Sequence, residues 1–191
     1  MNPVRLLVIA WIGLAAVLSA QHTLSTPYAE NNAQSGNMFD IQATRDLTIH
    51  SFDVNLDVGT WDVEVWIPKE RGPMAPVLNL PNRWEKVATV PSVTSNGVNV
   101  PTPLNLALGI PIASGDALGI YITVTSGSGM RYTSVPDPVG SVANADIAMT
   151  ITVGYGVGYP FSGLFQPRRW NGTVHFNRGF NVPTDHPSIQ A

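Results

Sequence analysis

Apolar residues along this chain recur at every second position, and glycine or proline interrupts the pattern every few residues. A period of two places apolar side chains on one face of a β-strand, whereas no stretch follows the period of about 3.6 residues that marks a helix. The 17 glycines and 16 prolines divide the alternating stretches into short pieces and predict many turns. The pattern therefore predicts an all-β fold, an antiparallel β-sandwich of jelly-roll type with about eight to ten strands.

The clearest alternation lies in two neighbouring stretches, residues 104–110 and 118–124. Leucine or isoleucine fills every second position of the first, and leucine, isoleucine or valine every second position of the second. Ser114-Gly115-Asp116 between them predicts a chain reversal. We expect these stretches to form a pair of strands that bury their aliphatic side chains.

A change of phase marks the stretch from Leu47 to Leu56. Its apolar residues stand first at odd positions, Leu47 and Ile49, and then at even positions from Phe52 onward. A strand that changes face without an irregularity would expose half of its apolar side chains, so we expect a bulge or bend near His50-Ser51.

Two segments predict long loops. Residues 69–83 contain three prolines, and residues 154–163 are rich in glycine and tyrosine. Glycine and proline both disfavour the interior of a strand, which is why neither segment is expected to join a sheet.

The first twenty residues are typical of a bacterial secretory signal peptide. Arg5 provides the positive charge, an apolar stretch follows, and Leu18-Ser19-Ala20 offers small residues for cleavage. The apolar stretch is shorter than the roughly 20 residues that a transmembrane helix needs, and no second one follows, so no membrane span is expected after cleavage. The sequence thus predicts a secreted or periplasmic protein with four parts: a signal peptide at 1–20, an N-terminal arm at 21–34, a β-sandwich domain at 35–178 and a flexible C-terminal tail at 179–191.

Composition excludes several classes of function. The chain has no cysteine, which excludes disulfides and zinc sites built on thiolates. The net charge is −3, without the clustered basic footprint of a nucleic-acid-binding protein, so no nucleic-acid partner is expected.

Four oxygen-bearing side chains follow the spacing of a calcium loop, at its positions 1, 3, 5 and 12: Asp53, Asn55, Asp57 and Glu64. The loop pattern requires glycine at position 6, but Gly59 stands at position 7, and no helix flanks the segment. The same residues alternate with apolar ones, which fits the solvent face of a strand. Ca²⁺ is therefore kept as an alternative, and no other cofactor is expected.

Four aromatic side chains are expected to lie away from the core or in a loop: Trp66, Tyr121, Tyr155 and Tyr159. Exposed aromatic rings stack on the apolar faces of sugars, which makes these residues the candidate ligand-binding set. The alternative is that outward aromatic rings pack against one another across neighbouring strands.

No catalytic residues are predicted. The four histidines form neither an HxH nor an HExxH pattern, and there is no GxSxG nucleophile elbow. A catalytic group assembled across strands would show itself as a cleft that joins His50 or His175 to a carboxylate.

Several phrases resemble a known group of proteins. They include Ser35-Gly36-Asn37-Met38-Phe39-Asp40, Phe52-Asp53-Val54-Asn55-Leu56-Asp57 and Arg169-Trp170-Asn171-Gly172-Thr173. Together they resemble exported β-sandwich modules of environmental bacteria, planctomycetes especially, and the strand order is remotely similar to the jelly roll of the PHR domain. The resemblance covers about residues 35–176. It implies a fold and a compartment, and it brings no catalytic residues.

The sequence therefore predicts a secreted, non-catalytic β-sandwich that serves as a binding or structural component of the cell exterior. A surface component, a matrix component or a glycan is the expected partner. The first alternative is a carbohydrate-binding module. The second is a secreted hydrolase with its site in the long loops at 69–83 and 154–163.

Overall fold

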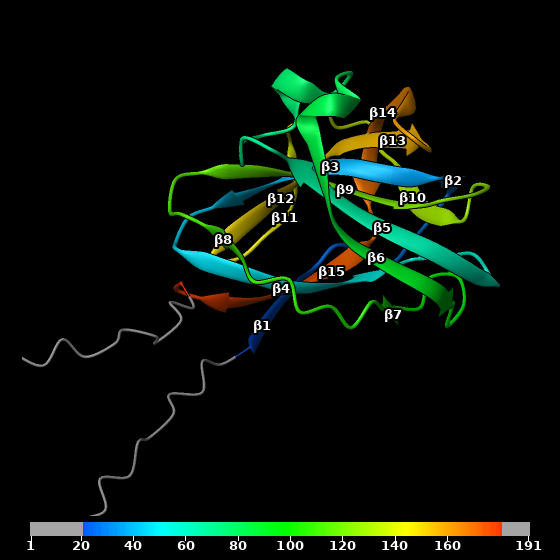
Figure 1. The fold of residues 1–191 in the computed structure, drawn as a ribbon, viewed down its shortest axis with the longest axis horizontal. Coiled ribbons are helices and arrows are strands. Elements are labelled where there is room, and N and C mark those ends of the chain that lie inside the picture. Colours follow the sequence, from blue (N-terminus) through cyan, green and yellow to red (C-terminus); the bar gives the residue numbers. More distant parts are fainter. Residues whose placement is uncertain (1–20, 181–191) are drawn as a thin grey trace, which may run out of the picture.

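Two antiparallel sheets make up residues 21–180, the part of the chain that the computed structural model describes (Figure 1). The predicted all-β sandwich is confirmed. These residues form fifteen strands where about eight to ten were expected, because irregularities divide the chain into many pieces of two to five residues. The five-stranded sheet contains β1 (Gln21–Ser25), β15 (Gly172–Arg178), β4 (Leu47–Val54), β7 (Thr102–Pro103) and β8 (Ile110–Ile112).

The ten-stranded sheet forms the other layer, in the upper part of Figure 1. Its path runs through β2 (Asn32–Gln34), β10 (Met130–Ser134), β14 (Ser162–Trp170), β13 (Gly154–Gly158), β3 (Gly36–Ala43), β9 (Ala117–Val124), β5 (Thr60–Pro68) and β6 (Trp84–Thr94). The last two strands, β11 (Val142–Ala145) and β12 (Met149–Thr152), continue it beside β3.

The chain crosses repeatedly between the two sheets, for example from β3 to β4, from β4 to β5 and from β14 to β15. This crossing corrects one expectation. The stretches 104–110 and 118–124 are not a pair of strands: residues 104–109 lie in no strand, and Ile110 begins β8, which pairs with β4 in one sheet while β9 pairs with β3 and β5 in the other. Their aliphatic side chains meet across the core instead of side by side.

The predicted bulge at His50 is confirmed. In the pairing of β4 with β15, Ser51 lies opposite His175 and Ile49 lies opposite Phe176, so His50 is the extra residue. The bulge lets Ile49 and Phe52 both be fully buried although one stands at an odd and the other at an even position.

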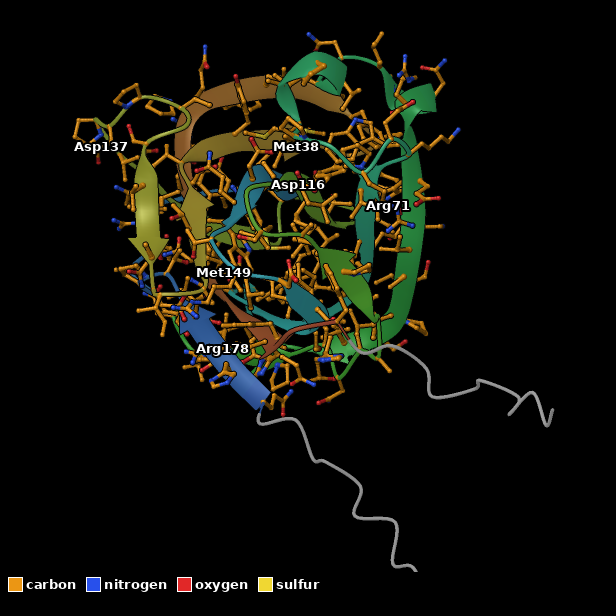
Figure 2. The ribbon with its side chains drawn as sticks, turned by 90° about the vertical axis from the view of Figure 1, so that its left-hand side faces the viewer. Met38, Arg71, Asp116, Asp137, Met149 and Arg178 are labelled. Carbon is orange, nitrogen blue, oxygen red and sulfur yellow. The ribbon has the colours of Figure 1, made fainter. Side chains whose placement is uncertain are left out.

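The main core fills the space between the sheets. Trp170 stacks on Phe39 with ring centroids 4.4 Å apart and meets the edge of Phe52. A second apolar cluster lies on the outer face of the ten-stranded sheet and contains Met38, Met74, Val77, Trp84, Tyr121 and Val157. Figure 2 labels one methionine of each cluster, Met149 of the main core and Met38 of the outer one.

Residues 69–83 form the predicted loop, with two short 3₁₀ turns, η1 (Ala75–Val77) and η2 (Pro81–Arg83). The loop packs against the outer cluster because Gly119 leaves room for it: a Cβ at Gly119 would lie 2.8 Å from the Met74 nitrogen. The Gly119 N–H donates to the Gly72 carbonyl at 2.9 Å, and the Met74 N–H donates to Asp40 Oδ1 at 2.8 Å.

The prediction of a loop over 154–163 is wrong except for residues 159–161, which form the turn between β13 and β14. Residues 154–158 are strand β13, paired with β3 on one side and β14 on the other. A Cβ at Gly154 would lie 1.9 Å from the Met38 carbonyl oxygen, and one at Gly156 would lie 2.6 Å from the Tyr132 hydroxyl. These glycines therefore serve close packing inside a sheet.

Residues 21–34, predicted as an arm, form the edge strands β1 and β2, with Leu24 buried against the core. The predicted signal peptide at 1–20 and positions 181–191 of the predicted tail lie outside the described residues. Within residues 21–180, no helix is long and apolar enough to cross a membrane.

Candidate functional site

A polar hollow of about 470 Å³ opens on the outer face of the five-stranded sheet. Strands β4 and β15 build it, because their inward positions carry Phe52, Val174 and Phe176 and the residues between these point outward. We call it the His175 hollow, lined by Gln21, Ser51, Asp53, Pro103, Asn105, Leu106 and His175.

A carboxylate and an imidazole meet in this hollow. His175 Nε2 lies 2.8 Å from Asp53 Oδ1, and the two side chains are only 22% and 13% exposed. Asp53 pairs with Thr173 in the strand register, two residue pairs along from Ser51 and His175 and on the same face, so the contact is diagonal across two neighbouring strands. The bond fixes the orientation of the imidazole ring.

Ser51, Asp53 and His175 are the residue types of a serine-hydrolase triad. The hydrogen bond that Ser51 makes, however, is with Leu106. The Leu106 N–H donates to Ser51 Oγ at 2.9 Å, and Ser51 is 8% exposed. The neighbouring N–H groups of Leu104 and Leu108 donate to the carbonyls of Phe52 and His50. Next to the bulge, the Ser51 hydroxyl thus accepts the hydrogen bond that a backbone carbonyl accepts at the neighbouring positions.

No hydrogen bond joins Ser51 to His175 within residues 21–180. A serine nucleophile needs a base within hydrogen-bond reach of its hydroxyl, with a third group that orients the base. Only the second half of that relay, the Asp53–His175 contact, is present.

Hydroxyl groups gather next to the hollow around Thr173, the register partner of Asp53. Thr173 Oγ1 lies 2.8 Å from the Ser25 hydroxyl and 3.2 Å from the Tyr28 hydroxyl. Burial raises the pKa of Tyr28, so its hydroxyl stays protonated at neutral pH. Asn105 holds a positive φ of 51°, a conformation that asparagine tolerates better than most residues. The hollow therefore combines many hydrogen-bonding groups with the small apolar surfaces of Pro103 and Leu106.

The four side chains with calcium-loop spacing do not come together. Asp53 contacts His175, whereas Asn55 is fully buried and exchanges two hydrogen bonds with Asn99. Asp57 pairs with Arg131, and this hydrogen bond lowers the pKa of the Asp57 carboxyl.

Glu64 Oε1 lies 2.8 Å from the Lys86 ammonium, on a buried face of β5. The segment does not stay one exposed strand, because β4 ends at Val54 and the chain then turns toward β5. In the described part of the chain, no three His, Asp or Glu side chains gather in a way that would hold a metal ion.

The candidate aromatic residues also differ from expectation. Tyr121 does point away from the main core, but the outer cluster covers it completely. Its hydroxyl donates to the Gly158 carbonyl at 3.2 Å, and burial raises the pKa of Tyr121 to about 12. Its ring centroid lies 4.8 Å from that of Phe161, a residue in the turn after β13 that the sequence did not single out.

Trp66 is half-buried beside the same cluster, edge-on to Phe161, and its indole N–H donates to Glu64 Oε2 at 3.0 Å. Tyr155 packs against the cluster, and Tyr159 is half-buried before the turn. The four rings therefore form no flat exposed row. Mutual packing of aromatic rings, the alternative reading of the sequence, describes Trp66, Tyr121 and Tyr155.

The comparisons with known proteins add little to this geometry. No family model matches the sequence, and no curated protein matches it. A search of solved structures found a chain of the T13 IBDV viral particle, with 14% sequence identity, a TM-score of 0.23, and coverage of 90% of this chain and 40% of that one. The chain thus spans less than half the length of that protein, and a TM-score this low bears on neither fold nor function. Fold and site together define an all-β sandwich with a polar hollow on one face.

Proposed function

We propose that this protein is an exported, non-catalytic β-sandwich module of the cell exterior that binds a glycan in the His175 hollow. The observation that carries the proposal is the Asp53–His175 pair, 2.8 Å apart, in an open hollow whose rim bears the amides of Gln21 and Asn105. Carboxylate, imidazole and amide groups accept from and donate to vicinal hydroxyls, and Pro103 and Leu106 offer apolar contact to the C–H face of a sugar ring.

This proposal moves the ligand site away from Trp66, Tyr121, Tyr155 and Tyr159. Three of these side chains pack into or against the outer cluster, on the other sheet, where Tyr121 has no exposed surface. The glycan hypothesis therefore rests on hydrogen-bonding groups instead of an aromatic platform.

Binding is tested by a glycan array on the purified protein, followed by calorimetry with the best oligosaccharide. Asp53→Asn removes the negative charge and weakens the hold on the imidazole, so we expect at least a tenfold loss of affinity, about 1.4 kcal/mol. His175→Ala should act in the same direction. Asp137→Asn is the matched control, because it makes the same chemical change in the exposed loop between β10 and β11 (Figure 2), outside the hollow.

Saturable binding that is lost in Asp53→Asn and kept in Asp137→Asn supports the proposal. Binding that is equal in all variants would place the glycan elsewhere, and the absence of binding to any glycan would overturn the function. Repeating the array with and without calcium tests the remaining cofactor alternative.

A hydrolase is the second candidate, favoured by the presence of Ser51 in the same hollow as Asp53 and His175. Its test is the release of p-nitrophenol from acyl esters. Turnover above background that disappears in both Ser51→Ala and His175→Ala would replace the binding function by a catalytic one. We expect no such turnover, because within residues 21–180 no hydrogen bond joins the Ser51 hydroxyl to His175, the base that would have to take its proton.

Export is the part of the proposal that depends on the predicted leader at 1–20. Cell fractionation should find the protein outside the cytoplasm, and N-terminal sequencing should begin at Gln21, the first residue of β1. A cytoplasmic protein that keeps Met1 would contradict export without touching the binding site.

A further inference from the structure

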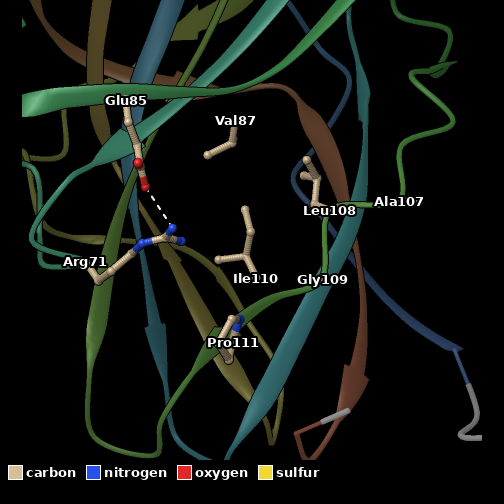
Figure 3. Close-up of a pocket in the computed structure, with 8 residues that line it drawn as sticks. All are labelled: Arg71, Glu85, Val87, Ala107, Leu108, Gly109, Ile110 and Pro111. Carbon is tan, nitrogen blue, oxygen red and sulfur yellow. Dashed lines mark ion pairs between the residues drawn. The ribbon is translucent and has the colours of Figure 1, made fainter. Parts of the chain in front are cut away.

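A second cleft of about 500 Å³ lies between the free edge of β6 and the segment that leads into β8. Part of its wall is apolar: Figure 3 shows the Val87, Leu108 and Ile110 side chains around one space, with Pro111 below. At one end of that space stands a single ion pair, in which an Arg71 guanidinium nitrogen lies 2.7 Å from Glu85 Oε1. We call this the Arg71 cleft.

The backbone holds Arg71 at this position. Its φ is +55°, in the left-handed region that non-glycine residues rarely adopt, and its N–H donates to the Pro68 carbonyl at 3.0 Å. The next residue, Gly72, accepts the Gly119 N–H and so ties the loop to the ten-stranded sheet. Residues in sparsely populated backbone conformations are frequent at ligand sites, and Arg71 is such a residue.

The charges at the mouth are available to a ligand. The Arg71 and Glu85 side chains are 51% and 38% exposed, and an exposed ion pair is only weakly favourable, so opening it is easy. A ligand with a single charge would leave either the carboxylate or the guanidinium without a partner. A ligand with an ammonium and a carboxylate close together satisfies both, the carboxylate on the planar guanidinium and the ammonium on Glu85.

We propose that the Arg71 cleft binds a free apolar α-amino acid. The zwitterionic head replaces the Arg71–Glu85 contact, and an aliphatic or aromatic side chain enters the space between Val87, Leu108 and Ile110. A peptide fits less well, because its amino and carboxyl charges are separated by the length of the chain. The proposal does not rest on the binding of a glycan in the His175 hollow, and its test is separate.

Calorimetry with the purified protein tests the proposal, using L-leucine and L-phenylalanine as ligands. Three analogues each remove one feature: glycine lacks the side chain, N-acetyl-L-leucine lacks the ammonium, and L-leucinamide lacks the carboxylate. We expect saturable binding of L-leucine or L-phenylalanine with a Kd of millimolar or below, and at least tenfold weaker binding of all three analogues. No saturation by either amino acid up to about 10 mM, or equal affinity for the analogues, would overturn the proposal.

Two substitutions localise the binding. Glu85→Gln should weaken L-leucine at least fivefold and leave the weaker binding of N-acetyl-L-leucine unchanged. Arg71→Asn, chosen because asparagine tolerates a positive φ, should weaken L-leucine and leave L-leucinamide unchanged.

The neighbouring ion pair provides matched controls. Arg83 Nε lies 2.7 Å from Glu70 Oε1 and joins the two ends of the loop 69–83. The two side chains have a similar exposure to Arg71 and Glu85, but they do not line the cleft. Glu70→Gln and Arg83→Asn should therefore leave L-leucine affinity unchanged. An equal loss in both pairs of variants would show that the ion pairs act only by holding the loop, and would overturn the site.

Discussion

Asp40 carries a carboxylate beneath the loop 69–83, where it accepts the Met74 N–H. Burial raises the pKa of Asp40, and the hydrogen bond from Met74 offsets part of that effect. Between the ordinary carboxyl value of about 4 and this raised value, the folded state binds more protons than the unfolded state. The free energy of unfolding therefore falls as the pH rises through this window.

The substitution Asp40→Asn tests this linkage. The amide keeps an oxygen to accept the Met74 N–H but cannot ionise. We expect the variant to be more stable than the wild type at pH 7, with the difference shrinking as the pH falls toward 4. Urea denaturation between pH 4 and 7 measures it, and parallel stability curves for the two proteins would contradict the buried charge.

Trp66 packs against the outer cluster, so its removal should lower the stability of the fold. Truncating a buried aromatic ring costs about 3–5 kcal/mol, and for half-buried Trp66→Ala we expect about 2 kcal/mol. Trp66→Phe keeps a ring beside Phe161 and should lose less. Thermal and urea unfolding give these values. A variant that melts like the wild type but loses glycan affinity would restore Trp66 as a ligand-binding residue.

Strand β13 depends on the absence of side chains at three of its five positions. For Gly154→Ala we expect a loss of about 3 kcal/mol or more, because the new methyl group would collide with the Met38 carbonyl of the paired strand β3.

Gly72→Ala is the matched substitution, since a Cβ there meets nothing within 4 Å. It should be neutral or up to about 1 kcal/mol stabilising, through a smaller entropy of the unfolded chain. Equal stability of the two variants in urea would mean that β13 does not pack as described.

Strand β13 is an element that the sequence alone could not predict. Alternation of apolar residues was enough to predict β9 and, from a change of phase, the bulge at His50. It also predicted a strand over 104–110, where only Ile110 lies in one. The glycines in 154–158 do not reveal a strand, because glycine is equally typical of a flexible loop and of a strand whose backbone lies close to a neighbour. Only the pairing with β3 and β14 decides between them.

At the scale of the molecule, one core between two sheets holds the sandwich together. Ile122 is fully buried in that core, whereas Leu106, on the irregular edge segment between β7 and β8, is half-buried. We expect Ile122→Ala to cost about 2–5 kcal/mol and Leu106→Ala about 1 kcal/mol. Urea denaturation followed by circular dichroism ranks them, and an equal loss would place Leu106 inside the core.

The site could be predicted only in parts. Asp53 was expected on the solvent face of a strand, but 122 positions separate it from His175 in the chain, and no local pattern indicates that β4 pairs with β15. The outward face of Tyr121 was also predicted, yet nothing in its own strand shows that a distant loop covers that face. Periodicity reports the direction of a side chain, whereas its neighbours depend on the whole topology.

Residues 104–109 separate the His175 hollow from the Arg71 cleft. Asn105 and Leu106 line the first, and Leu108 and Gly109 line the second. If a ligand on one side displaces this segment, the volume of the other site changes and the two sites are thermodynamically linked. The factor by which a first ligand alters the affinity for a second equals the factor in the reverse direction. A titration of one site with the other saturated would therefore measure heterotropic coupling, and the thin crossing segment would be the part that transmits it.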